Sequence, residues 1–144
     1  MNNIAFIDLE IDGRGKIVDA GAVKAGKSIH TSRIAEFVAF ISDADYLCGH
    51  NIIEHDYKYL KSFLPKDYAL IDTLYLSPLL FPRKPYHRLL KDDKLLSDEL
   101  NNPLNDALKA KELFEDEVNA FNNIDKRMQQ IYYELTASDI HFKG

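Results

Sequence analysis

The segment IAFIDLE (residues 4–10) constrains the fold of this chain more than any other stretch. It is almost continuously apolar and rich in branched side chains, which is typical of a buried strand. Asp8 and Glu10 stand two residues apart at its C-terminal end, so both side chains leave the same face of the strand. Two neighbouring carboxylates are costly to bury unless cations neutralise them. The segment therefore predicts a buried strand with an acidic pair at its end, and a metal site is one interpretation of that pair.

Strand and helix patterns alternate along the rest of the chain. The turn DGRGK (12–16) predicts a hairpin between the first strand and IVDAGAVKA (17–25). Further strands are predicted within SIHTS (28–32), YLCGHN (46–51) and YALIDTLYL (68–76). Apolar residues at helical spacing predict helices over about 34–41, 53–64, 104–121 and 125–135. The prolines at 78, 82 and 85 indicate an irregular connection. This order predicts an α/β fold, with a central mixed sheet, an antiparallel leading hairpin and flanking helices.

Length and composition limit the classes of protein that the chain can belong to. Its 144 residues predict one domain, and the ending TASDIHFKG suggests a domain excised from a larger protein. No apolar run approaches the roughly 20 residues of a membrane helix, so no membrane partner is expected. The single cysteine, Cys48, excludes an internal disulfide and is expected to be a small buried thiol in a reducing, cytoplasmic setting.

Charge argues against one mode of nucleic-acid binding and leaves another open. The net charge of −5 is unlike that of basic proteins that coat nucleic acid, although bound cations would reverse the field at an acidic site. One basic stretch, PRKPYHRLLKDDK (82–94), combines cations with an aromatic ring, as single-stranded nucleic acid requires. A solvated surface segment is the alternative, given Asp92 and Asp93. The predicted nucleic-acid contacts there are Arg83, Lys84, Tyr86 and Arg88.

Two later segments bring further carboxylates to the margins of apolar faces. In GHNIIEHDYKYL (49–60) the chain leaves a strand and enters a helix, and Asp56 lies beside the apolar stripe of that helix. Asp106 lies in the first turn of the helix that opens at Pro103. Two divalent ions about 4 Å apart need about as many shared oxygen ligands as these three elements supply.

Taken together, FIDLE, GHNIIEHD and NNPLNDALKAKELF resemble, in order and spacing, the three motifs of the DEDD superfamily of 3′→5′ exonucleases. That superfamily includes the proofreading (DnaQ-like) and RNase T-like enzymes, which have a ribonuclease-H-like fold. The resemblance covers nearly the whole chain, including IDTL (71–74), which resembles the strand that usually follows the second motif. The combination of GHNI, FPRKPYH and NNPLNDA also resembles the exonuclease-like domain fused to some RecQ-type helicases.

The resemblance implies a ribonuclease-H-like fold in which Asp8, Glu10, Asp56 and Asp106 hold two Mg²⁺ or Mn²⁺ ions. One ion would activate a water toward the terminal phosphodiester and the other would stabilise the leaving 3′ oxygen. The implied substrate is a single-stranded 3′ end, with DNA favoured over RNA, and the product is a nucleoside 5′-monophosphate. Asn51 of the second motif is a further expected nucleic-acid contact. A covalently linked helicase or polymerase domain, and a role in DNA repair, are the expected context.

The chain departs from the family where a general base is expected. The family places a histidine five residues before the last aspartate, or a tyrosine four before it, and this chain has Asn101 and Asn102 there. Neither amide can accept a proton at useful pH, and losing a general base costs about 10²–10⁴-fold in rate. Asn102 and Pro103 form an ordinary N-cap and first helical position, and Asn101 could hold a water or phosphate.

His87 is a candidate substitute base, with a phosphate contact or an ordinary surface histidine as alternatives. Three readings of the chain follow. The first is a metal-dependent 3′→5′ exonuclease domain that is slow or needs its parent protein. The second is a catalytically weak or inactive nuclease-fold module that binds 3′ ends or a partner protein. The third is a purely structural appendage, against which the four retained acids count.

Overall fold

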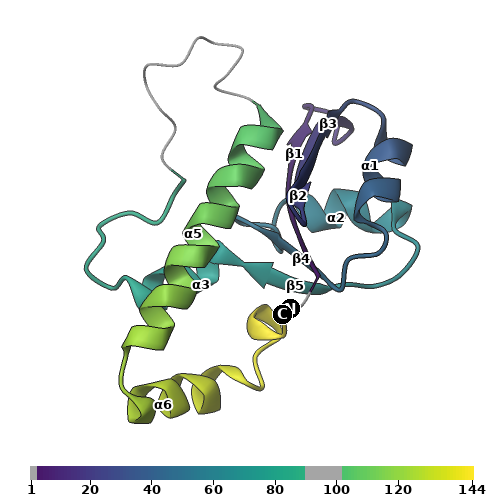
Figure 1. Ribbon diagram of the computed structural model, residues 1–144. Coiled ribbons are helices and arrows are strands. Elements are labelled where there is room, and N and C mark those ends of the chain that lie inside the picture. The colour runs from purple at the N-terminus through teal and green to yellow at the C-terminus, as the bar shows by residue number, and fades with distance from the viewer. Residues whose placement is uncertain (1–2, 90–101) are drawn as a thin grey trace.

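The computed structural model describes residues 3–89 and 102–144 and shows an α/β fold built on a five-stranded mixed sheet (Figure 1). The strands lie in the order β3-β2-β1-β4-β5, where β1 is antiparallel to β2, β2 is antiparallel to β3, and β4 and β5 are parallel to β1. This confirms the predicted mixed sheet with its antiparallel leading hairpin and agrees with a ribonuclease-H-like arrangement. The strands are β1 (Ile4–Ile11), β2 (Ile17–Lys24), β3 (Lys27–Thr31), β4 (Tyr46–Gly49) and β5 (Ala69–Asp72).

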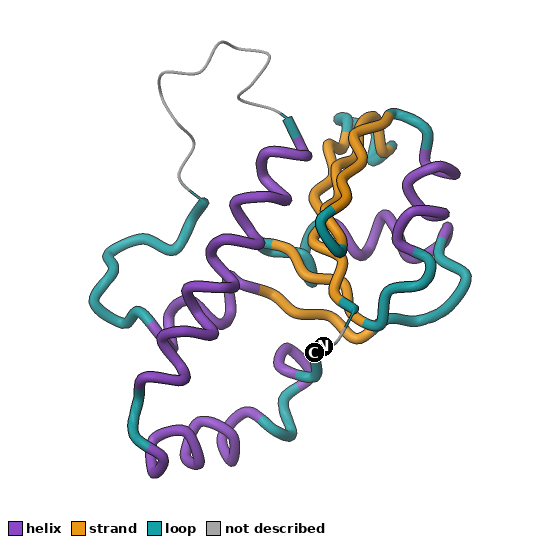
Figure 2. The backbone as a smooth tube through the Cα atoms, viewed as in Figure 1, coloured by secondary structure: helices purple, strands orange, loops and turns teal. Residues whose placement is uncertain are grey.

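Helices cover both faces of the sheet (Figures 1 and 2). One face carries α1 (Ile34–Ile41) and α2 (Asp56–Leu60), the latter followed by the short 3₁₀ helix η1 (Lys61–Phe63). The other face carries α5 (Pro103–Asn123), which packs across β1 and β2, and α3 (Thr73–Leu80), which packs against α5. The chain then continues through α6 (Lys126–Thr136) and η2 (Ile140–Phe142). Within the described ranges, no helix combines the length and apolarity needed to cross a membrane.

The two faces of β1 have different partners because successive strand side chains point to opposite sides. Ala5, Ile7 and Leu9 are buried in the main core with α1 and α2. The alternate residues face α5, and the Phe6 ring lies 5.9 Å from the ring of Phe114. Asp8 and Glu10 continue this second face, so the acidic pair lies on the side of the sheet that α5 covers.

Two local features differ from the sequence prediction. Asp56 is the first residue of α2, whereas the pattern placed it one turn inside a helix. Pro78, expected in an irregular connection, lies inside α3. Proline there removes a single internal hydrogen bond. Both ends of this short helix stay satisfied, because Asp72 accepts from the Leu74 N–H (3.0 Å) and Phe81 donates to the Ser77 carbonyl (2.8 Å).

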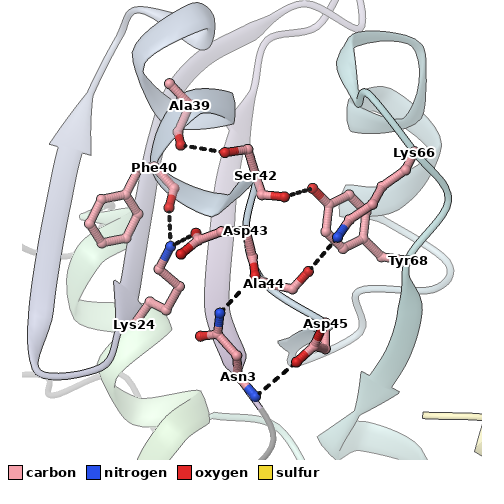
Figure 3. A network of polar contacts seen from close by, with 10 residues as sticks. All are labelled: Asn3, Lys24, Ala39, Phe40, Ser42, Asp43, Ala44, Asp45, Lys66 and Tyr68. Atoms are coloured by element: carbon pink, nitrogen blue, oxygen red, sulfur yellow. Dashed lines mark hydrogen bonds and ion pairs between the residues drawn. The ribbon is translucent and has the colours of Figure 1, made fainter.

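A polar network joins the segments that lead into the three parallel strands (Figure 3). Asn3, just before β1, donates through Nδ2 to the carbonyl of Asp43 at 2.7 Å. Lys66 and Tyr68, just before β5, donate to the carbonyls of Ala44 (2.9 Å) and Ser42 (3.1 Å). The loop before β4 is therefore held from both sides. These contacts align the amino ends of β1, β4 and β5, and the opposite edge of the sheet carries the polar side chains described below.

One buried group on α5 is chemically unusual. Glu117 is 1% exposed, and neither of its carboxylate oxygens has a hydrogen-bond partner among the described residues. Burial, reinforced by the negative charge of Asp72, raises the pKa of Glu117 to about 8. The thiol of Cys48 is fully buried, as predicted, and its pKa is raised by burial and then by the charge of Glu117.

Glu117 should make stability fall as the pH rises. Its folded pKa of about 8 lies above its ordinary value of 4.5, so the folded state holds a proton that the unfolded chain releases. The contribution of Glu117 to the free energy of unfolding is fully present below its ordinary pKa. It is lost as the pH rises through the folded pKa, at up to about 1.4 kcal/mol per pH unit. Urea unfolding from pH 5 to 9 should show Glu117→Gln losing a few kcal/mol less than wild type.

The matched control is Glu112→Gln, because Glu112 is an exposed carboxylate on the same helix. The free energy of unfolding of Glu112→Gln should change with pH as it does in the wild type. Parallel curves for wild type and Glu117→Gln would show that Glu117 is ionised without penalty in the fold.

Candidate metal centre

The first two carboxylates of the site come from the end of β1. Asp8 lies opposite Gly21 of β2, and Glu10 lies opposite Asp19. Like charges directly opposite each other in a sheet are destabilising. Here Asp19 is engaged by His30, whose Nε2 lies 2.7 Å from its Oδ2. Regular strand pairing therefore fixes the spacing of Asp8 and Glu10 on the α5 side of the sheet.

The third carboxylate depends on an unusually close approach of α5 to β2. A Cβ atom on Gly21 would lie 2.2 Å from the backbone nitrogen of Leu104 and 2.4 Å from the carbonyl carbon of Pro103. No real side chain fits in that space, so the first turn of α5 rests directly on the backbone beside Asp8. This contact brings Asp106, which is 9% exposed, over the end of β1.

The start of α5 is formed by an ordinary capping arrangement, as predicted. The side-chain oxygen of Asn102 accepts from the N–H groups of Leu104 (3.0 Å) and Asn105 (3.4 Å), and Pro103 occupies the first turn. An aspartate in the first turn also complements the positive end of the helix dipole. The predicted role of Asn101 concerns a residue outside the described ranges.

Three of the four predicted ligands meet. One carboxylate oxygen from each of Asp8, Glu10 and Asp106 lies within 4.8 Å of the others. Oxygen ligands of this kind suit hard divalent cations such as Mg²⁺ and Mn²⁺. Because the residues come from β1 and α5, which are packed together, the group could hold a metal ion without rearrangement of the fold.

Asp56 is not part of that group of oxygens. It is 2% exposed, and its Oδ1 accepts a hydrogen bond of 3.0 Å from the N–H of Leu9, the residue between Asp8 and Glu10. β4 pairs with β1 only as far as Phe6, so Asp56 supplies an acceptor where that strand partner has ended. Burial raises the pKa of Asp56, and its neighbour His55 counteracts this. In this structure Asp56 braces the end of β1.

Asp72 organises the turn that precedes α2, and the sequence prediction gave it no such role. Its Oδ1 accepts from the N–H of Asn51 (2.8 Å), and its Oδ2 accepts from the N–H of Ile53 (3.1 Å). Asn51 has a left-handed backbone with φ of 66°, which asparagine tolerates better than most residues. This conformation explains an asparagine at position 51, and its predicted contact with nucleic acid stays a prediction. The sequence offered no local signal for this role, because Asp72 contacts residues 19 and 21 positions earlier in the chain.

The histidines near these elements differ in their partners, which are hydroxyl groups for His87 and His50 and a carboxylate for His55. His87 does not join the carboxylate group, and its Nδ1 lies 2.9 Å from the hydroxyl of Ser77 on α3. His50 is held by Thr73, with Nδ1 2.8 Å from Oγ1. His55 lies beside Asp56, with Nδ1 3.8 Å from Oδ1, and its interaction with Asp56, aided by the charge of Glu10, raises its pKa against the opposing effect of burial. His50 also lies within electrostatic reach of an acid of the group, because burial lowers its pKa while the charges of Asp72 and Asp106 act in the opposite direction.

Both the predicted basic segment and one residue of α5 supply cations. Arg83, Lys84 and Arg88 are exposed, as is Tyr86, which is 81% exposed. Lys84 lies 4.4 Å above the ring of Phe81. A cation missed by the sequence prediction is nearer the acids: the ammonium of Lys109 lies 3.9 Å from Oδ1 of Asp106. The available signal was its position three residues after Asp106 on the same helix.

No protein-family model matches the chain, and no curated protein is significantly similar to it in sequence.

Gly21→Ala should separate the two halves of the acidic group. The added methyl would collide with backbone atoms of Pro103 and Leu104, so α5 must move away from β2, at a cost of roughly 1–3 kcal/mol or more. Because Asp106 moves with the helix, Mn²⁺ affinity measured by calorimetry should fall at least tenfold. Gly13→Ala is the control, since a methyl there meets nothing within 4 Å. Unchanged Mn²⁺ affinity in a folded Gly21→Ala protein would contradict this account.

Proposed function

We propose that this chain is a metal-dependent 3′→5′ exonuclease domain of the DEDD type, which hydrolyses terminal phosphodiesters of single-stranded nucleic acid, DNA in preference to RNA. The observation that carries the proposal is the convergence of Asp8, Glu10 and Asp106 within 4.8 Å. It occurs at the carboxyl end of β1, in a sheet of ribonuclease-H-like arrangement. The order and spacing of the three sequence motifs support the same function.

The proposed cofactors are two Mg²⁺ or Mn²⁺ ions. Asp8, Glu10 and Asp106 would supply the shared oxygen ligands, and Asp56 is the adjacent fourth carboxylate. When bound, such ions provide a hydroxide nucleophile at neutral pH and stabilise charge on the leaving oxygen. Asp56 would support the site whether or not it binds an ion itself, because its hydrogen bond to the Leu9 N–H holds the backbone between Asp8 and Glu10.

Residues around the carboxylates would position the substrate. The ammonium of Lys109, 3.9 Å from Asp106, stands where it could contact a phosphate brought to the metal site. Exposed Arg83, Lys84 and Arg88 with Tyr86 would bind the strand farther from the reacting phosphate, through charge and base stacking. A linked helicase or polymerase domain would then deliver the 3′ end.

The proton acceptor has two candidates. His87 has one ring nitrogen at the hydroxyl of Ser77, which leaves Nε2 as the atom that would have to act. His55 is exposed and within the electrostatic reach of both Asp56 and Glu10. Proximity to the acids favours His55 as the group that accepts a proton from the attacking water or contacts the phosphate.

The second candidate function is a binding module that holds 3′ ends without cutting them. The capping role of Asn102 favours it, because the side-chain oxygen four residues before Asp106 is already engaged by two backbone N–H groups. A module of this kind would still bind cations and single-stranded DNA. It would lack turnover.

The nuclease proposal predicts stepwise shortening of 5′-labelled single-stranded DNA in Mn²⁺, with release of nucleoside 5′-monophosphates. Asp8→Asn preserves the shape of the side chain and removes a charged ligand, so cleavage should fall by at least 100-fold. Asp116→Asn, an exposed acid on α5, is the control and should cleave at the wild-type rate. Retained 3′-end binding without cleavage by wild type would support the binding module, and absence of both would overturn the two proposals.

The missing base predicts a gain of function. Asn101→His restores the family's histidine five residues before Asp106 and should raise single-turnover cleavage, toward the roughly 10²–10⁴-fold worth of a general base. His55→Ala should lower the wild-type rate if His55 substitutes for that base, while His87→Ala should do so if His87 is the substitute. An unchanged rate in Asn101→His would show that proton removal does not limit this protein.

A further inference from the structure

Three cations near the carboxyl end of β1 form no ion pair. Arg14 and Lys16 lie in the turn between β1 and β2, Lys58 lies on α2, and all three are exposed. None of them has an ion-pair or side-chain hydrogen-bond partner among the described residues. Asp12, the acid in the same turn, accepts from the backbone N–H groups of residues 14 and 16 at 2.9 Å, and these bonds, more than the charge of Lys16, lower its pKa. In a chain with a net charge of −5, this positive charge is a local exception.

The ring of Tyr59 on α2 connects the turn to the helix. A Cβ atom on Gly15 would lie 3.4 Å from Cε1 of Tyr59, so the ring rests against the turn that carries the first two cations. The ammonium of Lys58 lies 4.8 Å from the ring centroid. The ring of His55 meets Tyr59 nearly edge-on, at a centroid distance of 5.9 Å. These residues form one patch, named here the Tyr59 surface, which consists of Arg14, Lys16, His55, Lys58 and Tyr59.

His55 joins the Tyr59 surface to the acidic group. Its Nδ1 lies 3.8 Å from Oδ1 of Asp56, and the same oxygen accepts from the N–H of Leu9. The charge of Glu10 also reaches His55, where it adds to the effect of Asp56 in raising the pKa. The Tyr59 surface therefore begins where the acidic group ends.

The composition of the Tyr59 surface indicates the kind of partner that it fits. Single-stranded nucleic acid supplies phosphates for cations and flat bases for aromatic rings, and proteins that bind it combine both kinds of side chain. The ammonium of Lys58 has no hydrogen-bond partner among the described residues. A base could therefore take its place over Tyr59 while the ammonium turns to a neighbouring phosphate. A purely acidic peptide would satisfy the cations but offers no planar ring to stack on Tyr59.

We propose that the Tyr59 surface binds single-stranded nucleic acid, with a base stacked on Tyr59 and phosphates paired with Lys58 and the cations of the β1–β2 turn. The proposal rests on the proposed function for one point, which is that the 3′ end lies at the acidic group. The strand would then leave that group over α2. The basic segment 82–88 follows α3 on the other face of the sheet, so the Tyr59 surface is a separate contact with the strand.

Anisotropy of a fluorescein-labelled oligothymidylate of about eight nucleotides tests the stacking contact. The 144-residue chain is titrated in EDTA, which prevents metal-dependent cleavage, so binding is measured whether or not the chain is a nuclease. Tyr59→Ala should weaken binding roughly fivefold or more, as loss of one base-stacking ring does. Tyr59→Phe keeps the ring and should restore affinity. Tyr133→Ala, which removes an exposed ring on α6, is the control and should bind as the wild type does.

Salt dependence tests the phosphate contact. For single strands, each phosphate neutralised by a cation contributes roughly 0.7 to the slope of log affinity against log salt concentration. Lys58→Gln should therefore reduce the slope by about that amount. Lys143→Gln, which removes an exposed cation near the C-terminus, should leave the slope unchanged.

Three results would overturn the proposal. They are an absence of oligothymidylate binding by the wild type, wild-type affinity and slope in both Tyr59→Ala and Lys58→Gln, and equally tight binding of a polyglutamate peptide. The outcome is separable from that of the nuclease proposal. Cleavage in Mn²⁺ that Tyr59→Ala leaves unchanged would retain the nuclease and reject the Tyr59 surface, whereas Tyr59-dependent binding without cleavage would do the reverse.

Discussion

The contact between the first turn of α5 and the bare backbone of Gly21 is the constraint on which the position of the acidic group depends. A strand residue without a side chain lets the helix rest directly on β2. That approach places Asp106 over Asp8 and Glu10 at one point of the helix. Farther along the same face, Phe114 meets Phe6 at a ring separation of 5.9 Å. One close backbone contact therefore sets the position of both the acidic group and the apolar packing beside it.

The arrangement of strands and helices could be predicted because its signals are local. Apolar periodicity located the strands and most of the helices but missed α3, and the Asn-Pro pair marked the start of α5 correctly. The roles of Gly21 and Asp56 could not be predicted, because each depends on a partner far away in the sequence, Leu104 and Leu9 respectively. The burial of Glu117 could not be predicted either, because a glutamate between apolar helix positions usually lies at the edge of the buried face. Its side chain is buried in the structure, where α3 packs against α5.

α5 carries two acidic groups in opposite chemical settings. Asp106 belongs to a cluster of carboxylates that could hold a metal ion, whereas Glu117 is an isolated carboxyl whose pKa of about 8 keeps it mostly protonated at neutral pH. The two residues are 11 positions apart, which corresponds to about 16 Å along the helix. One rigid helix therefore places an acidic group at its amino end and a buried, protonated carboxyl in its second half.

The three clustered carboxylates come from distant parts of the sequence, so the cluster forms only when the tertiary structure forms. Asp8 and Asp106 are 98 residues apart, so the group cannot form from any local hairpin or helix and exists only after α5 has docked on β2. Closing so long a loop is entropically costly and comes late relative to local structure. A cation that binds all three acids would thus recognise the completed domain and stabilise it as a whole by mass action. The acidic group is thus a property of the completed tertiary structure rather than of any one segment of the chain.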